Sequence, residues 1–594
     1  MLPKDYLSNV YGAPHTAGGW SPTRRDVVKL MGAGAAASLI GSSRAFAQSA
    51  DGKQPNIVMV VIDDAGFSDL GAYGSEIKTP HIDELATGGL RYNRFDTCAI
   101  CSPTRAALMT GRNPQTVNMD DLPGKGEAPP IDSLNAHSGE LPLNAETVAA
   151  ALQKTGYATF ALGKWHLCPT YSDDDARNRL SWPRQRGFDY FYGFLSGHTD
   201  QYHPDLVENN TVLPTPDNPD YHLSVDLVDH AIDAMQPDKT DKPKFVYLAL
   251  GATHSPYHVP EAYIDAYRGA YDKGWDEIRK ERFARQKDIG IIPDNTVLPP
   301  REVGDAAWDT LDDQHKRVFA RFMETYAGFM THTDEQIGRL VDYLKETGQY
   351  DNTLIMLITD NGAASEGGAN GGFFTPYLDK TTVAEMDAHL DEAGSPSTYM
   401  LYPRPWAYAG DTPFRRYKLW PYAGGVRTPM IVSWPDHIED AGAVRSQYVN
   451  VIDLAPTILA VAGGGFSTSV DGVEQLPVAG KSALETFTSS DAATRSVQFF
   501  TMRGNRAITD GDWRAVAMHR IDTDFDEDPW QLFNVAEDFS ESHDLSQENP
   551  EKLEAMKALW WEEAKKYANP PLADPVELLY NLNGFGDAFE NIGD

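Results

Sequence analysis

The chain has 594 residues, of which 41% are hydrophobic and 23% charged, a composition typical of folded globular proteins rather than disordered ones. Its 51 Lys and Arg residues against 86 Asp and Glu residues give a net charge of −35, which argues against nucleic acid or an anionic membrane surface as a general partner. Three cysteines exclude a disulfide-stapled scaffold and a four-cysteine zinc site. Because the length exceeds that of one ordinary domain, we expect two domains.

The first residues have the pattern of an export signal. Arg24 and Arg25 open a basic stretch, a weakly apolar run follows from Leu30 to Ile40, and Ala45-Phe46-Ala47 resembles a cleavage site. A short buried or membrane helix is the alternative, but the run is too short to span a bilayer. We therefore expect residues 1–47 to be a twin-arginine signal peptide, recognised by the twin-arginine translocase. The mature protein would be periplasmic or secreted, without a membrane segment.

Five short apolar runs, rich in β-branched residues, predict strands that are buried on both faces. These runs are residues 57–62, 158–162, 245–250, 354–358 and 430–432. Helical patterns lie between them, for example at 147–155 and 332–347, and each of these two ends at a glycine. Strands that alternate with helices indicate a large doubly wound α/β domain with a mixed or parallel sheet, to which we assign residues 48–480.

The pattern changes after a run of glycines at 463–465. Residues 496–501, 513–518 and 530–535 predict short strands separated by turns, and a helix from about 550 to 567 follows. Strands in succession and then a helix indicate a smaller α+β domain with an antiparallel sheet, which we assign to residues 481–594.

Four of the predicted strands run directly into ionisable residues. In chain order, these are Asp63-Asp64, Lys164 with His166, His254, and Asp360-Asn361. Ligand sites of open α/β sheets lie beyond the carboxyl ends of the strands, so we expect one site, lined by acids from two strands and by bases from the other two.

The two acidic pairs supply only oxygen ligands, which suit Ca²⁺ or Mg²⁺ and not zinc. Adjacent residues of a strand point to opposite faces, so both members of a pair can bind one ion only from the turn after the strand. Gly66 and Gly362 would allow such turns. A single pair is typical of a plain turn, but two pairs at two strand ends indicate a metal site.

The segment Cys101-Ser102-Pro103-Thr104-Arg105 predicts a helix start, and Gly111 predicts its end. Cys101 would then lie at the helix N-terminus, where the dipole stabilises negative charge, and Arg105 would lie one turn further on. Cys98 and Cys101 also form a C-x-x-C pair. A redox or metal role for that pair is the weaker alternative, because no second pair follows.

These motifs resemble type I sulfatases, of the alkaline-phosphatase-like superfamily, in the same order along nearly the whole mature chain. Residues 101–105 with Thr110-Gly111-Arg112 are similar to the sequence at which a separate formylglycine-generating enzyme oxidises the cysteine to Cα-formylglycine. Gly163–His166, Asp360–Gly362 and Gly424–Pro429 also follow the family order, and Arg186–Phe194 is similar to the bacterial arylsulfatases.

The resemblance implies a role for each polar residue of the site. Asp63, Asp64, Asp360 and Asn361 would hold Ca²⁺, with Mg²⁺ as the alternative, together with an oxygen of the modified Cys101. Arg105 and His166 would orient the formylglycine hydrate, and Lys164, His254 and Lys418 would bind sulfate oxygens. His254 would also donate a proton to the leaving oxygen, with His258 as a second candidate. Ala423 departs from the pattern, because the bacterial branch usually has Glu there.

The implied reaction is hydrolysis of a sulfate monoester, an aryl sulfate or a similar ester, to an alcohol or phenol and inorganic sulfate. One hydroxyl of the hydrate would attack sulfur, and deprotonation of the other would release sulfate and regenerate the aldehyde. Small-molecule and carbohydrate esters both remain open as substrates. So do two other functions: a phosphonate or phosphodiester hydrolase of the same superfamily, and a non-catalytic protein that binds sulfated glycans. Aromatic residues of the 372–420 segment would form a wall of the site or simply pack.

Overall fold

The computed structural model describes residues 53–123, 139–169, 176–302, 304–375 and 379–567. The predicted signal peptide lies outside these residues, as does the end of the chain from residue 568. Among the described residues, no helix combines the length and the apolar character that crossing a bilayer requires.

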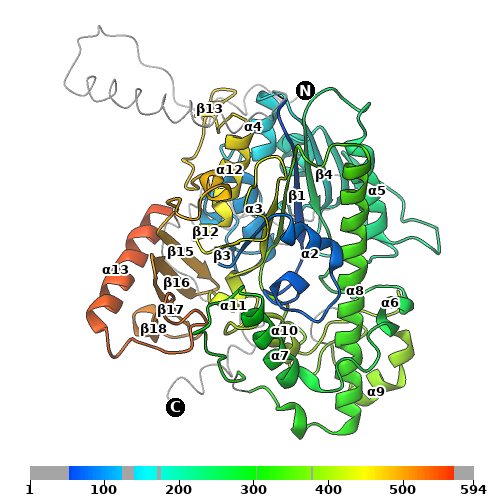
Figure 1. The fold of residues 1–594 in the computed structure, drawn as a ribbon, viewed down its shortest axis with the longest axis vertical. Coiled ribbons are helices and arrows are strands. Elements are labelled where there is room, and N and C mark those ends of the chain that lie inside the picture. The colour runs from blue at the N-terminus through cyan, green and yellow to red at the C-terminus, as the bar shows by residue number, and fades with distance from the viewer. Residues whose placement is uncertain (1–52, 124–138, 170–175, 303, 376–378, 568–594) are drawn as a thin grey trace.

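A ten-stranded sheet forms the centre of the molecule (Figure 1). Its strand order is β11 (Val444–Arg445), β2 (Leu90–Tyr92), β10 (Met430–Ser433), β9 (Thr353–Thr359), β1 (Asn56–Ile62), β8 (Lys244–Ala249), β4 (Ala158–Lys164), β5 (Tyr190–Phe194), β6 (Val207–Glu208) and β7 (Thr211–Val212). The five central strands from β9 to β5 are mutually parallel, whereas β10 is antiparallel to β9. The mixed, mostly parallel sheet confirms the predicted fold class.

Helices cover both faces of this sheet because the strands are apolar on both faces. Alternate residues of β1 enter different cores: Val58, Val60 and Ile62 lie in the core that includes α5 (Leu223–Met235) and α8 (Asp313–Glu346). Ile57, Met59 and Val61 lie in the core that includes α3 (Cys101–Thr110), α4 (Val148–Lys154) and α12 (Leu454–Val461). Further α-helices are α2 (Pro80–Thr87), α6 (Glu261–Asp265), α7 (Gly274–Asp288), α9 (Val383–Ala388), α10 (Arg404–Gly410) and α11 (Ala423–Val426).

Two predicted elements differ from the structure. The run at 430–432 forms β10 but pairs antiparallel, which an apolar run alone cannot indicate. The helix predicted from His332 begins at Asp313, where Asp312 caps it by accepting a hydrogen bond from the backbone N–H of His315. Every residue from Val318 to Met330 is buried, so this part of the helix has no solvent-exposed face.

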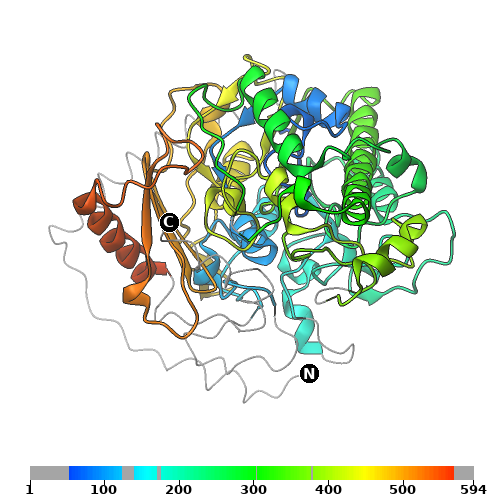
Figure 2. The same ribbon diagram turned by 90° about the horizontal axis from the view of Figure 1, so that it is seen from below.

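A separate four-stranded antiparallel sheet follows, in the order β15 (Val497–Met502), β16 (Asn505–Asp510), β17 (Trp513–Ala517) and β18 (Trp530–Asn534). The last helix, α13 (Pro550–Tyr567), covers one face of it through Met556, Trp560 and Ala564. Figure 2 shows this small sheet between α13 and the rest of the molecule. The predicted antiparallel sheet and final helix are present, with β16 as an additional strand. The boundary at residue 480 stays a prediction.

Candidate active site

The carboxyl ends of four parallel strands bring the predicted site residues together. Asp63 follows β1, Asp360 follows β9, Lys164 is the last residue of β4, and His254 lies a few residues beyond β8. These strands are direct neighbours in the order β9-β1-β8-β4. Parallel neighbours end at the same edge of a sheet, so acids and bases from distant parts of the sequence meet there.

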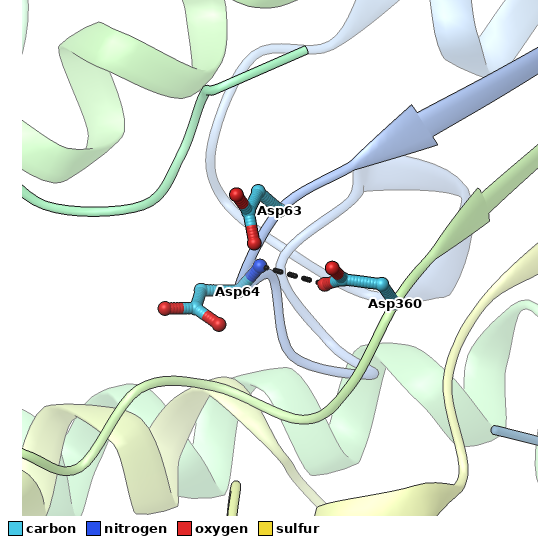
Figure 3. Close-up of side chains that lie close together, drawn as sticks. All are labelled: Asp63, Asp64 and Asp360. Atoms are coloured by element: carbon cyan, nitrogen blue, oxygen red, sulfur yellow. Dashed lines mark hydrogen bonds between the residues drawn. The ribbon is translucent and has the colours of Figure 1, made fainter. Parts of the chain in front are cut away.

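Three carboxylates form the floor of the site. Asp63, Asp64 and Asp360 are buried, and ligand oxygen atoms of the three lie within 4.8 Å of one another (Figure 3). The turn after β1 is left-handed at Asp64 (φ 59°), whose backbone N–H donates to Asp360 Oδ1 at 3.3 Å. Asn361 joins the group, because its Nδ2 donates to Asp64 Oδ1 at 2.7 Å.

Gly66 and Gly362 were predicted to allow these turns through their conformational freedom, but they have a different role. Neither Gly66 nor Gly362 has a positive φ. A Cβ at Gly362 would lie 1.9 Å from the carbonyl oxygen of Gly424, and one at Gly66 would lie 2.5 Å from the backbone of Gly410. Both positions therefore require glycine for close backbone approach.

The chemistry of this group fits a hard divalent cation. Within the described chain, Asp63 Oδ1 and Asn361 Oδ1 are buried oxygens without a hydrogen-bond partner. A buried oxygen without a partner is costly unless it coordinates a cation, and carboxylate and amide oxygens are the ligands that Ca²⁺ and Mg²⁺ prefer. The residues predicted to bind metal can therefore hold such an ion.

Each acid also has a basic partner. Lys164 Nζ lies 2.6 Å from Asp63 Oδ2, and Lys418 Nζ lies 2.9 Å from Asp64 Oδ2. Burial raises the pKa of Asp63 to about 8, with Asp360 adding to the effect and Lys164 opposing it. Burial would also raise the pKa of Asp64, but Lys418 and His254 outweigh it and hold that pKa below its usual range.

Arg105 donates hydrogen bonds to the acidic floor. Its Nε and Nη2 donate to Asp360 Oδ2 at 3.0 and 2.7 Å, and its Nη1 donates to the Tyr247 hydroxyl at 3.3 Å. The guanidinium is fully buried, as are both partners. The role of Arg105 in orienting the group at position 101 stays a prediction. Tyr247 is a further residue of the site, which the sequence did not reveal because it lies within a strand.

Cys101 begins helix α3, which ends before Gly111 (φ 63°), as predicted. Its Sγ lies 3.3 Å from His166 Nδ1. Burial raises the pKa of Cys101 to about 11, against the opposing charges of Lys164 and Lys418. The helix terminus was expected to favour negative charge here, but desolvation outweighs it, and the thiol stays protonated at neutral pH. Burial also lowers the pKa of His166 well below its usual value.

The two candidate histidines have different surroundings. His254 Nε2 lies 3.5 Å from Asp64 Oδ2, and its Nδ1 lies 2.7 Å from the carbonyl oxygen of Ser255. His258 instead contacts the carbonyl oxygen of Thr398 at 2.7 Å, away from the acidic floor. This arrangement favours His254 over His258 as the candidate proton donor.

The site also contains residues that the sequence patterns did not reveal. The ring of His198 lies parallel to that of His254 at 5.7 Å, and Tyr399 meets His198 edge-on at 5.8 Å. Glu366 Oε1 lies 2.7 Å from Lys418 Nζ. Most described aromatic residues of the 372–420 segment are buried and pack, namely Phe373, Tyr402, Trp406, Tyr408, Phe414, Tyr417 and Trp420. Tyr377 lies outside the described residues.

All three cysteines are free thiols, so the C-x-x-C pair forms no disulfide. Ala423 is buried, and its backbone N–H donates at 3.0 Å to the carboxylate of Glu541, which follows the small sheet. A carboxylate from the end of the chain thus lies beside the position where the resemblance leads one to expect Glu.

Comparisons with known proteins agree with this geometry. Residues 55–464 match the family described as Sulfatase, and residues 415–567 match the family described as N-sulphoglucosamine sulphohydrolase, C-terminal. An uncharacterized sulfatase of Schizosaccharomyces pombe is 32% identical over 87% of this chain and 94% of its own length. An arylsulfatase of Klebsiella aerogenes is 31% identical over 76% of this chain and 96% of its own.

A solved structure has the same fold. It is the crystal structure of Ps i-CgsB in complex with k-i-k-neocarrahexaose, with a TM-score of 0.60 at 24% identity. The match covers 90% of this chain and 98% of that one.

Proposed function

The chain belongs to the sulfatase family, and on this premise we propose that it hydrolyses sulfate monoesters with an aryl or similar leaving group. The observation that carries the proposal is the position of Cys101, beside His166 at the edge of a buried cluster of acids and cations. The 31% identity to an arylsulfatase supports an aryl leaving group. A carbohydrate ester is the second candidate, because the solved relative of 24% identity is described with a bound saccharide.

Asp63, Asp64, Asp360 and Asn361 would hold Ca²⁺, with Mg²⁺ as the alternative. The ion would supply positive charge where charge develops on the sulfate oxygens during the reaction. Two unpartnered buried oxygens within this group, among the described residues, support the assignment.

Cys101 would carry the nucleophile after its conversion to formylglycine. The hydrated aldehyde would supply one hydroxyl for attack on sulfur and a second for release of sulfate. The unmodified thiol is a poor nucleophile here, because its pKa is about 11 and the anion is scarce at neutral pH. His166 Nδ1 faces this side chain and would accept a hydrogen bond or proton from it.

Lys164 and Lys418 would bind the sulfate oxygens. Each ammonium group contacts a carboxylate, at 2.6 and 2.9 Å. A cation held by those carboxylates would compete for the same oxygens, leaving the ammonium groups able to bind the ester. His254 would protonate the leaving oxygen through Nε2. Because its Nδ1 lies against the carbonyl oxygen of Ser255, Nε2 carries a proton only when the ring is an imidazolium. Burial lowers the pKa of His254 and opposes this form, whereas Asp64 Oδ2, 3.5 Å from Nε2, favours it.

The decisive experiment joins mass spectrometry of the Cys101 peptide to a substrate panel. Purified protein should carry an aldehyde at position 101 and hydrolyse nitrophenyl sulfate, with alkyl sulfates, carbohydrate sulfates and a phosphodiester as comparators. Cys101→Ala is the control for contaminating activity. Full activity with an intact thiol would contradict the mechanism, and preferential phosphodiester cleavage would favour the phosphonate or phosphodiester hydrolase. Binding of a sulfated glycan without turnover of any ester would favour the non-catalytic alternative.

A further inference from the structure

Asp411 is a buried carboxylate that joins the two acidic turns of the site without belonging to either. It is the residue after α10 and has no exposed surface. Its Oδ1 accepts hydrogen bonds from the backbone N–H groups of Phe67 at 3.3 Å and Ala363 at 3.2 Å, and its Oδ2 accepts from Ala363 at 3.0 Å. One side chain therefore bridges the turn after β1 and the turn after β9.

Both bonded amides lie a few residues from proposed metal ligands. Phe67 is three residues beyond Asp64, and Ala363 is two residues beyond Asn361. The carbonyl oxygen of Ala363 also accepts a hydrogen bond from the backbone N–H of Lys418 at 3.1 Å. The carboxylate of Asp411 thus contacts both acidic turns directly, and through Ala363 it is linked to the backbone of Lys418.

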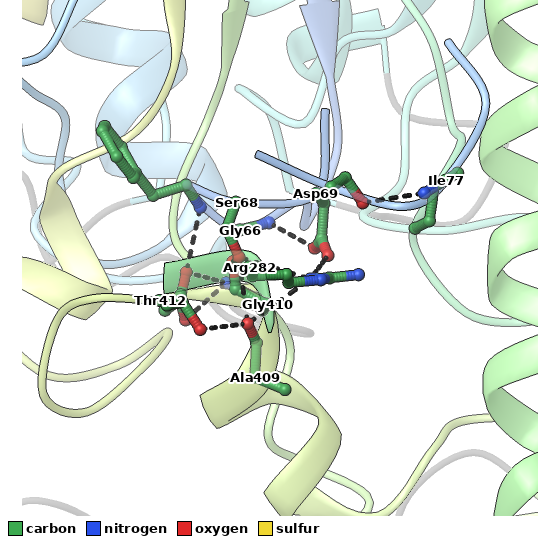
Figure 4. Close-up of polar contacts among 12 residues, drawn as sticks. Gly66, Ser68, Asp69, Ile77, Arg282, Ala409, Gly410 and Thr412 are labelled. Carbon is green, nitrogen blue, oxygen red and sulfur yellow. Dashed lines mark hydrogen bonds and ion pairs between the residues drawn. The ribbon is translucent and has the colours of Figure 1, made fainter. Parts of the chain in front are cut away.

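The surroundings of Asp411 leave little room for these turns to move. A Cβ at Gly66 would lie 2.7 Å from Asp411 Oδ1 and 2.5 Å from the backbone of Gly410. Figure 4 shows Asp69 between Gly66 and Arg282. Asp69 Oδ2 accepts from the N–H of Gly66 at 2.9 Å, and Arg282 Nη1 donates to Asp69 Oδ1 at 2.6 Å.

Arg282 also ties this turn to the segment that carries Asp411. The same Nη1 lies 3.4 Å from the carbonyl oxygen of Ala409, and the backbone N–H of Ser68 donates to the carbonyl oxygen of Gly410 at 2.8 Å. The turn after β1 is therefore held from two sides. On the side of β9, Asp411 accepts the N–H of Ala363, the residue whose carbonyl oxygen contacts Lys418.

We propose that Asp411 is a positioning residue, which sets the spacing of the two acidic turns and thereby the affinity of the site for its metal ion. The inference rests on the proposed metal site. Groups that hold metal ligands in place from outside the ligand shell commonly contribute roughly 10- to 100-fold to metal affinity or activity. Asp411→Asn should therefore weaken Ca²⁺ binding by roughly that factor.

Asp334 offers a matched control. It too is a buried carboxylate that accepts two backbone N–H groups, from Ile82 at 2.8 Å and His81 at 3.2 Å. Its contacts, however, join α8 to α2 and do not involve the acidic turns. Asp334→Asn should lower stability while leaving Ca²⁺ affinity unchanged.

The experiment measures Ca²⁺ binding by calorimetry on metal-stripped full-length protein, and backbone hydrogen exchange by mass spectrometry on the same samples. Asp411→Asn should weaken binding and accelerate exchange in peptides covering both 63–70 and 360–366. Asp334→Asn should accelerate exchange around 80–87 and leave those two regions protected. The exchange pattern separates a local effect on the turns from a general loss of stability.

The possible outcomes distinguish failure of the proposed metal site from failure of the proposed role of Asp411. Unchanged Ca²⁺ affinity in folded Asp411→Asn, with wild-type protein binding normally, would overturn the role of Asp411 and leave the metal site intact. Wild-type protein that binds neither Ca²⁺ nor Mg²⁺ would overturn the proposed metal site and this inference with it. If Asp411→Asn does not fold, Asp411→Glu retains the carboxylate but displaces it, and equal affinity in that variant would overturn the inference as well.

Discussion

At the scale of residues, charge in the site is balanced locally and not by the molecule as a whole. Lys164 lies against Asp63, Lys418 against Asp64, and Arg105 against Asp360. A chain with a net charge of −35 can therefore bind an anionic ester, because the field inside a buried site depends on the nearest groups.

His254 allows a sharp test of this arrangement. If it protonates the leaving oxygen, His254→Ala should slow turnover of alkyl sulfates by roughly 10²- to 10⁴-fold and that of nitrophenyl sulfate far less, because a phenolate departs without a proton. If it only binds sulfate, every ester should slow by a similar factor. A leaving-group series on wild type and variant, with formylglycine content checked, separates the two roles.

His258 provides the control for that series. It lies four residues away and contacts the carbonyl oxygen of Thr398, so His258→Ala should give the same slope as wild type. Parallel slopes for His254→Ala would reassign it to sulfate binding. A steeper slope for His258→Ala instead would identify His258 as the proton donor.

Residues that directly follow apolar strands could be predicted from the sequence, because the strand end itself fixes where they lie. The acids at 63, 64 and 360 are of this kind. Tyr247 could not be found, because a tyrosine inside a buried strand is indistinguishable from core. Asp411 could not be found either, because it lies in an irregular segment 344 positions from Phe67, the residue whose amide it accepts.

At the scale of elements, α8 holds the molecule together through polar as well as apolar contacts. Helix α2 begins at Pro80, and within the described chain its N-cap residue Thr79 makes no side-chain capping hydrogen bond. Asp334 of α8 supplies the missing acceptor, for Ile82 at 2.8 Å and His81 at 3.2 Å. One helix thus caps another, which sequence reasoning cannot foresee because capping signals are local.

This cap makes stability depend on pH. Burial raises the pKa of Asp334 from 3.8 to about 7, against the opposing effect of the two backbone N–H groups. The folded state therefore holds a proton that the unfolded chain releases, and stability should fall as pH rises from about 4 to about 7, by on the order of 4 kcal/mol. Asp334→Asn should remove this contribution. Denaturant unfolding of both proteins at pH 5 and pH 8 checks it, and an equal pH dependence in the two would contradict it.

At the scale of the whole molecule, an export signal would decide where the protein works. We propose that the twin arginines at 24 and 25 direct export of the folded, modified protein. Changing both to lysine should leave active protein in the cytoplasm, measured by cell fractionation and sulfatase assay. Normal export of the double variant would contradict this, and a variant of Lys29 to Arg, which retains both arginines, is the control.

The ten-stranded and four-stranded sheets share a hydrophobic core. Alternate residues of the small sheet enter different cores, with Phe499 and Ile508 against α13, and Phe500 and Val516 in the core shared with the large sheet. Short runs separated by turns predicted the small sheet, and apolar residues at helical spacing predicted its helix. Neither pattern could predict the contact itself, because the paired surfaces come from distant parts of the chain and have no common local pattern.

Glu541 is the residue through which this contact should influence catalysis. Its Oε1 lies 2.7 Å from Arg514 Nε of β17, and its Oε2 accepts the N–H of Ala423, five residues beyond Lys418. Both charged groups are fully buried. Arg514 also donates to the carbonyl oxygen of Pro421, so the pair holds the backbone that follows Lys418 from two sides.

Glu541→Gln retains the shape of the side chain but leaves Arg514 with its more distant carboxylate partner, Asp96, at 3.5 Å. Loss of one member of a buried ion pair typically costs about 3–5 kcal/mol, and we expect an effect of that order on the free energy of unfolding. Because the disturbed backbone leads to Lys418, kcat/KM for sulfate esters should fall as well, even at temperatures where the variant is fully folded.

Glu554→Gln on α13 is the control, since it removes an exposed pair with Lys557 and should change neither the free energy of unfolding nor kcat/KM measurably. If the two variants behave alike in unfolding and in turnover, the small sheet is a passive neighbour of the site; if only Glu541→Gln loses both, the small sheet is part of the framework that positions Lys418.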